Sequence, residues 1–135
     1  MRKILYFFLL FFLFGCSDNS ITKKYKQNLV DKQIDCLSML VFPSDQGIED
    51  SLNKLYDFND SCNYKLQVSK KGGIICNSSH NLQKKVLNNF PSGYLKMNLY
   101  SGNIPLYNYY IDLKNEPTSS DVERAFSKIR EELHF

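Results

Sequence analysis

The sequence predicts an α+β fold, with a four-stranded antiparallel sheet and helices packed on it, preceded by one or two N-terminal helices. Beyond Asn59, apolar and polar residues alternate in two pairs of segments, which is typical of half-buried strands. A segment of helical periodicity follows each pair, and Gly- or Pro-containing turns separate the segments. The order strand, strand, helix therefore occurs twice, as two ββα units.

The N-terminal part of the domain has a mixed pattern. Residues 23–41 place their apolar side chains nearer to helical spacing than to alternation, which favours a helix, although residues 36–42 fit a strand equally well. Ser44 or Asp45 can cap a second helix, which should end near Phe58. The apolar face of this second helix consists of Ile48, Leu52 and Leu55.

The first ββα unit begins with the alternating residues 64–68. Residues 70–73 predict a turn, and residues 74–76 predict the returning strand. A serine at 78 or 79 can cap the helix that follows, and Pro91 ends it.

The second unit alternates over residues 94–100. Gly102-Asn103 suits a two-residue type II′ hairpin turn, because glycine can take the positive φ at its first position, and residues 104–113 form the return strand. The final helix begins between Thr118 and Asp121, with Ser120 and Glu123 as its capping box. Its apolar stripe is Val122, Phe126, Ile129 and Leu133.

The first fifteen residues have the features of a secretory signal. Arg2 and Lys3 form a positive start, and residues 4–14 are an unbroken apolar run. This run is too short to cross a bilayer as a helix, which needs about 20 apolar residues. We expect a signal peptide at 1–15.

The signal ends in Leu13-Phe14-Gly15-Cys16, which resembles the lipobox of bacterial lipoproteins. Phe14 departs from that pattern, in which a small or β-branched residue is usual. The resemblance covers residues 1–16 only, and it implies that Cys16 carries a diacylglyceryl lipid and palmitate and becomes the mature N-terminus. It places the protein in the cell envelope, facing the periplasm. An Asp directly after the lipidated cysteine would resemble the signal that retains lipoproteins in the inner membrane of many Gram-negative bacteria. Position 17 is Ser, so the resemblance favours the outer membrane, although Asp18 lies one place later.

Three parts of the chain follow from this interpretation. Residues 1–15 are the signal peptide, residues 16–22 are the lipidated cysteine with a short polar tether, and residues 23–135 form a single domain. The whole chain has a formal charge of +3, of which Arg2 and Lys3 supply two. The near-neutral mature part argues against a nucleic-acid partner, which usually meets a marked basic excess.

Three cysteines remain besides Cys16, and an oxidising compartment favours one disulfide among them. In the predicted 62–76 hairpin, Cys62 lies about 17–20 Å along the strand from the residue opposite Cys76. A disulfide needs Cα atoms within about 7 Å, so Cys62–Cys76 is disfavoured and Cys36 must be a partner. The sequence favours Cys36–Cys62, with Cys76 buried.

No catalytic or metal-binding motif is found in the sequence. The cysteine spacings match no zinc pattern, the two histidines His80 and His134 share no ligand motif, and no phosphate- or dinucleotide-binding glycine loop occurs. A thiol–base pair of Cys76 and His80 is the less favoured interpretation, because Cys76 lies in an apolar run. We expect no enzyme, no metal and no cofactor.

The second hairpin carries an unusual number of tyrosines. If Gly102-Asn103 is the turn, Leu99 faces Leu106 on the core side, and the tyrosines of both strands share the other side. Tyrosine is enriched in interfaces because it combines a large rigid ring with a polar tip. The predicted partner-binding residues are Tyr94, Lys96, Tyr100, Tyr107 and Tyr109. Alternatively, the N-terminal helices cover this side and the tyrosines belong to the core.

These observations predict a lipoprotein that binds an envelope protein, as an accessory subunit of a secretion, pilus or conjugation assembly. One alternative is an immunity or exclusion protein that neutralises a toxin or phage. A third interpretation, from another class, is a periplasmic enzyme that acts on the cell wall, with the tyrosines stacking on sugar rings.

Overall fold

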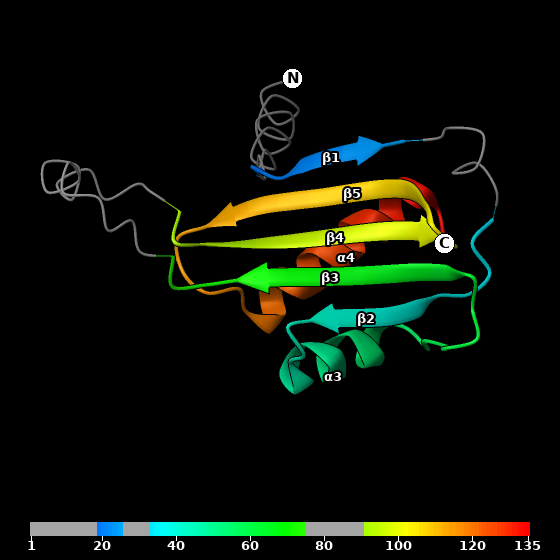
Figure 1. Cartoon of the computed structure of the whole chain (residues 1–135), viewed down its shortest axis with the longest axis horizontal. Coiled ribbons are helices and arrows are strands. Elements are labelled where there is room, and N and C mark those ends of the chain that lie inside the picture. The colour runs from blue at the N-terminus through cyan, green and yellow to red at the C-terminus, as the bar shows by residue number, and fades with distance from the viewer. Residues whose placement is uncertain (1–18, 26–32, 75–90) are drawn as a thin grey trace, which may run out of the picture.

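The computed structural model describes residues 19–25, 33–74 and 91–135 (Figure 1). These residues form a five-stranded mixed sheet in the order β1-β5-β4-β3-β2 and two helices. The sheet strands are β1 (Ile21–Lys24), β2 (Ser38–Phe42), β3 (Tyr64–Lys71), β4 (Gly93–Ser101) and β5 (Ile104–Leu113). The helices are α3 (Gln46–Leu55) and α4 (Ser119–Leu133).

The expected four-stranded antiparallel sheet is therefore wrong. β2 pairs in parallel with β3, and β1 adds an antiparallel strand beside β5. Both additions join segments far apart in the chain, and local periodicity carries no sign of such pairing. For residues 36–42, the strand alternative is confirmed, since β2 lies there. The helix expected over 23–41 is wrong where the structure describes it, because β1 occupies its beginning and β2 its end.

The first ββα unit is also changed. β3 pairs directly with β4, and Ile74 lies outside any strand, with its N–H donating to the Ser92 carbonyl. The remainder of the predicted second strand and the helix after it lie outside the described residues. The second unit is present as β4, β5 and α4.

Both helices begin and pack as their sequences require. Asp45 caps α3 by accepting from the Ile48 N–H. α4 starts at a capping box made by Thr118 and Asp121, two residues earlier than the predicted Ser120–Glu123 pair. The predicted apolar stripe of α4 is buried at all four positions: Val122, Phe126, Ile129 and Leu133.

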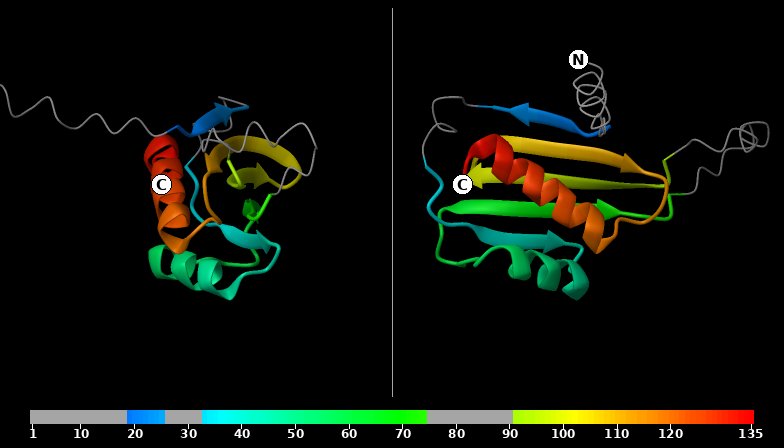
Figure 2. Two further views of the ribbon diagram at one scale, coloured as in Figure 1. Left: turned by 90° about the vertical axis from the view of Figure 1, so that its left-hand side faces the viewer. Right: turned by 180° about the vertical axis from the view of Figure 1, so that it is seen from behind.

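The helices lie on one face of the sheet (Figure 2). The core forms between them and the apolar side chains of the central strands, among them Leu66, Val68, Leu95, Met97 and Leu99, all fully buried. The aromatic rings of Tyr56, Phe58, Phe126 and Phe135 pack together at one end of α4. No described element covers the opposite face of the sheet, which faces the viewer in Figure 1.

Candidate binding face

The central strand β4 separates its side chains cleanly between the two faces. Leu95, Met97 and Leu99 are completely buried under the helices, whereas the residues between them are partly exposed. We call the side that no described helix covers the open face. Its central residues, from β4 and β3, are Tyr94, Lys96, Asn98, Tyr100, Lys65, Gln67, Ser69 and Lys71.

The neighbouring strand β5 contains a bulge that changes the predicted register. Leu99 pairs with Tyr107 and Tyr100 pairs with Pro105, so Leu106 is an extra residue with no partner. Beyond the bulge, every side chain of β5 lies on the face opposite to the one predicted. The predicted pairing of Leu99 with Leu106 is wrong.

The bulge moves two of the predicted binding residues into the core. Tyr107 and Tyr109 are 0% and 1% exposed and pack under α4. The Tyr107 hydroxyl donates to the Glu132 carboxylate at 3.0 Å, and burial together with this acceptor raises the pKa of the phenol. For these two tyrosines the core alternative is right, although the covering element is α4 rather than an N-terminal helix.

A sequence signal for the bulge exists at Pro105. Proline cannot donate to a ladder of hydrogen bonds, so within sheets it occurs at edges, at strand starts and at bulges. Pro105 is the second residue of β5 and directly precedes the extra residue Leu106, where the bulge shifts the register of the rest of the strand. The bulge places Asn108, Tyr110 and Asp112 on the open face instead of Tyr107 and Tyr109.

Tyr94, Lys96 and Tyr100 lie on the open face as predicted, and Tyr110 joins them. The rings of Tyr94 and Tyr110 stack with centroids 5.8 Å apart. The Tyr110 hydroxyl donates to Asp112 at 2.8 Å, and this bond raises the pKa of Tyr110. These contacts fix the two aromatic rings against each other at the end of the sheet where β4 begins.

Positive charge predominates on the open face. Four lysines lie there, against one carboxylate, Asp112, among the described residues of this face. No salt bridge between described residues involves any of the four; Lys23 instead lies over the Tyr25 ring, 4.8 Å from its centroid. The four lysines are Lys23, Lys65, Lys71 and Lys96.

Large apolar side chains lie at both edges of the open face. Ile21 on β1 is 65% exposed, and on β2 Leu40 and Phe42 are 47% and 67% exposed. Between the edges, the Asn108 amide donates to Asn98, and Gln67 pairs with Asn98 across the next strand. The face thus combines amides and tyrosines at its centre with apolar side chains at its rims.

A hollow of about 210 Å³ opens beside the β4–β5 turn. Its lining residues are Leu40, Lys65, Gln67, Tyr100, Gly102 and Asn103. The turn has the predicted type II′ character, with a positive φ at Gly102 and not at Asn103. The hollow is smaller than the ~300–1,000 Å³ of sites that enclose drug-sized ligands, and its volume suits a single side chain.

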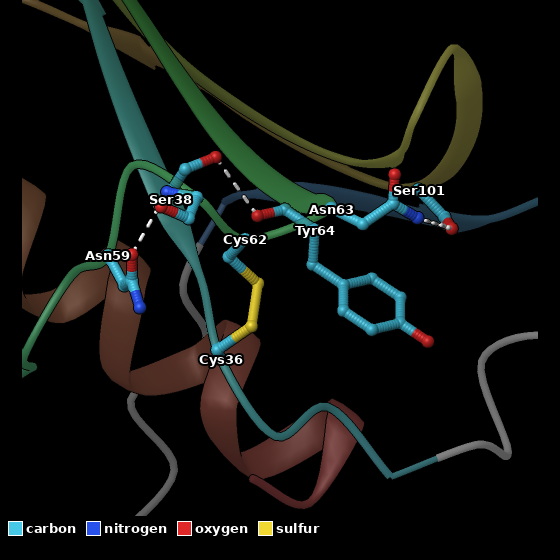
Figure 3. Close-up of a disulfide and its surroundings, with 8 residues drawn as sticks. Cys36, Ser38, Asn59, Cys62, Asn63, Tyr64 and Ser101 are labelled. Carbon is cyan, nitrogen blue, oxygen red and sulfur yellow. Dashed lines mark hydrogen bonds between the residues drawn. A yellow bond between two sulfur atoms is a disulfide. The ribbon is translucent and has the colours of Figure 1, made fainter.

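A disulfide lies close to this end of the sheet (Figure 3). Cys36 and Cys62 are joined, which confirms the predicted pair. They precede β2 and β3, whose parallel pairing sets Ser38 beside Lys65 and brings the two cysteines together. The bond therefore ties edge strand β2, with its exposed Leu40 and Phe42, to the neighbouring strand β3.

Cys16, Cys76 and His80 lie outside the described residues. Within the described ranges, no helix is long and apolar enough to cross a membrane. No group of His, Cys, Asp or Glu that could hold a metal ion occurs in that same part of the chain.

No known protein family, curated protein or solved structure matches this chain.

Proposed function

We propose that this protein is a lipid-anchored lipoprotein of the bacterial cell envelope whose domain binds a partner protein through the open face. The observation that carries the proposal is the composition of that face. It offers exposed apolar side chains, partly exposed tyrosines and lysines that form no salt bridge with a described residue, on a face of the sheet that no described element covers. Aromatic residues are enriched in protein interfaces, and the exposed apolar side chains at the two edges would gain from being covered by a partner.

The proposed anchor would keep this face close to a membrane. β1 begins at Ile21, five residues after Cys16, and five residues span at most about 18 Å. Two contacts fix β1 to α4, since Lys24 donates to the Glu132 carbonyl and Lys128 donates to the Ser20 hydroxyl. The domain would therefore be held at the membrane as one body. Such a position suits an accessory subunit of an envelope assembly, and we favour the outer membrane as its location.

The other two interpretations differ in what they require. A cell-wall hydrolase of the usual kind needs two carboxyl groups about 5–10 Å apart beside the bound sugar. Among its described residues the open face has Asp112 alone, and this carboxylate already accepts from Tyr110. An immunity or exclusion role would use the same face, and a neighbouring toxin gene would favour it over the accessory role.

Site-specific photocrosslinking in intact cells tests the proposal. A benzophenone amino acid replaces Lys96 at the centre of the open face, and a matched probe replaces Ser127, which is exposed on α4. We expect a discrete protein crosslink from position 96 and none from position 127. Crosslinks from position 127 alone, or none from either, would contradict binding through the open face.

The anchor has a separate test. Cys16→Ser should abolish lipid attachment and release the protein from the membrane fraction, because the thiol is the atom that would be acylated. A variant that is processed and fractionates like wild type would contradict the lipoprotein assignment.

A further inference from the structure

We infer that the hollow beside the β4–β5 turn is the anchoring point of the partner, and that it takes an acidic side chain next to a large apolar one from an extended segment of a protein. This inference rests on the proposed function and specifies its recognition chemistry. Three strands converge on the hollow: Leu40 comes from β2, Lys65 and Gln67 from β3, and Tyr100 from β4.

The lining supplies hydrogen-bond donors and no negative charge. Lys65 contributes an ammonium group, Gln67 and Asn103 contribute amides, and Tyr100 contributes a hydroxyl. Lys65 lies beside Tyr100 in the register and makes no salt bridge with any described residue. A carboxylate from outside would therefore meet a cation beside neutral donors, and hydrogen bonds between charged groups are stronger than those between neutral groups.

One wall of the hollow is apolar. Leu40 lies beside Gln67 in the parallel pair and is 47% exposed, and Phe42 follows on the same face of β2. An occupant that carried charge alone would leave this wall in water. An acidic residue with an apolar neighbour covers both, and alternate side chains of an extended segment have the spacing to reach them.

The position of the hollow favours a protein segment over a membrane surface. An anionic bilayer would attract the whole set of lysines, and it would not need a hollow of about 210 Å³ with amides on its rim. Carboxamides beside a lysine ammonium group instead suit one localised acceptor, such as a side-chain carboxylate. The occupant we assign is thus an acidic and apolar peptide segment, and a membrane becomes an outcome of the test.

The two ends of β3 provide a matched pair of variants. Lys65 and Lys71 are both exposed lysines on the open face, but only Lys65 lines the hollow. Lys65→Glu and Lys71→Glu change the overall charge equally, so a difference between them reports the hollow rather than general electrostatics.

The test is selection of a displayed random heptapeptide library on the full-length, detergent-solubilised protein. We expect enriched peptides that carry Asp or Glu next to a large apolar residue. Their affinity should fall at least about tenfold with Lys65→Glu, and by much less with Lys71→Glu. Replacing the peptide's carboxylate by its amide should cause a similar loss on the wild-type protein.

Other results would overturn the inference. Absence of enriched peptides, peptides without an acid, or equal losses from both variants would show that the hollow is not an acidic-residue site. Binding only to phosphatidylglycerol vesicles, and not to peptides, would show that the lysines serve a membrane. The crosslink from position 96 tests the proposed function independently, so it can hold while the hollow fails.

Discussion

The two faces of the sheet are built from the same strands and differ in almost every physical respect. On the helix-covered face, Met97 and Tyr109 face each other fully buried, and a short ion pair between Lys70 and Asp45 fixes the start of α3. On the open face, adjacent residues of the same strands are partly exposed lysines, amides and tyrosines. The comparison shows that a tyrosine's role here depends on register, because one bulge decides which tyrosines face water.

The largest effect should separate two consecutive tyrosines. Tyr109→Ala removes a ring that is 1% exposed and should lower the free energy of unfolding by about 3–5 kcal/mol. Tyr110→Ala removes a partly exposed ring that stacks on Tyr94 and should cost about 1 kcal/mol or less. Urea unfolding of both variants measures the difference. Equal losses would mean that the bulge does not separate the faces as described.

Loss of the disulfide should have the next largest effect. The double variant Cys36→Ala, Cys62→Ala opens a loop of 26 residues and should lose about 3–4 kcal/mol of stability. Because the bond ties β2 to β3, amide exchange should increase more in β2 than in β4. Reduced wild-type protein should behave like the double variant. Uniform exchange in both strands would show that β2 does not depend on the bond.

A smaller effect tests the buried hydroxyl under α4. Tyr107→Phe keeps the ring but removes the bond to Glu132, and it should cost about 1–2 kcal/mol. Tyr100→Phe on the open face is the control and should change stability by less, since its hydroxyl is partly exposed. An unchanged stability of Tyr107→Phe would favour the register expected from the sequence, in which that hydroxyl is in solvent.

The smallest effect concerns the ion pair at the start of α3. The hydrogen bond from Lys70, aided by the Ile48 N–H, holds the pKa of Asp45 below its ordinary 3.8. A lowered pKa contributes stability that is present above pH 3.8 and is lost as the pH falls through the folded-state pKa. The same bond raises the pKa of Lys70 above 10.5, and that contribution is present below pH 10.5 and lost as the pH rises through the folded value.

Asp45→Asn keeps an oxygen that can cap α3 but removes the charge. This substitution should lower the free energy of unfolding by up to about 1 kcal/mol at pH 7, because the side chains of Asp45 and Lys70 are both partly exposed. The difference from wild type should shrink as the pH falls below 3.8. Asp57→Asn, an exposed position, is the control. If the difference in stability between Asp45→Asn and wild type did not depend on pH, the loss would come from the helix cap of α3 and not from the ion pair.

Local sequence signals were sufficient where neighbouring residues decide the structure. Asp45 and the stripe from Val122 to Leu133 set the two helices, and Gly102 sets the turn. Long-range pairing could not be predicted, because nothing near Ile21 shows that it will lie beside Tyr110. The candidate face was predicted in part: Tyr94, Lys96 and Tyr100 lie on it, whereas the bulge at Leu106 turns Tyr107 and Tyr109 into the core.

The disulfide pair was predicted correctly, but the prediction used a hairpin that the described residues do not form. Cys36–Cys62 is confirmed, but the hairpin used to exclude Cys62–Cys76 is absent at its described end, since Ile74 bonds to Ser92 outside any strand. The physical cause of the pairing is the parallel register of β2 and β3, which sets the residues preceding each strand side by side.

A double measurement on Tyr100→Ala tests the open face most directly. Tyr100 lines the hollow and lies on the open face. Removal of its ring should therefore lower the free energy of unfolding by about 1 kcal/mol or less. In cells that produce the Tyr100→Ala variant, the protein crosslink from a benzophenone at position 96 should be lost or greatly reduced, because the Tyr100 ring is part of the proposed contact. A drop in Tm of many degrees with the crosslink retained would contradict the account and would make Tyr100 a structural residue.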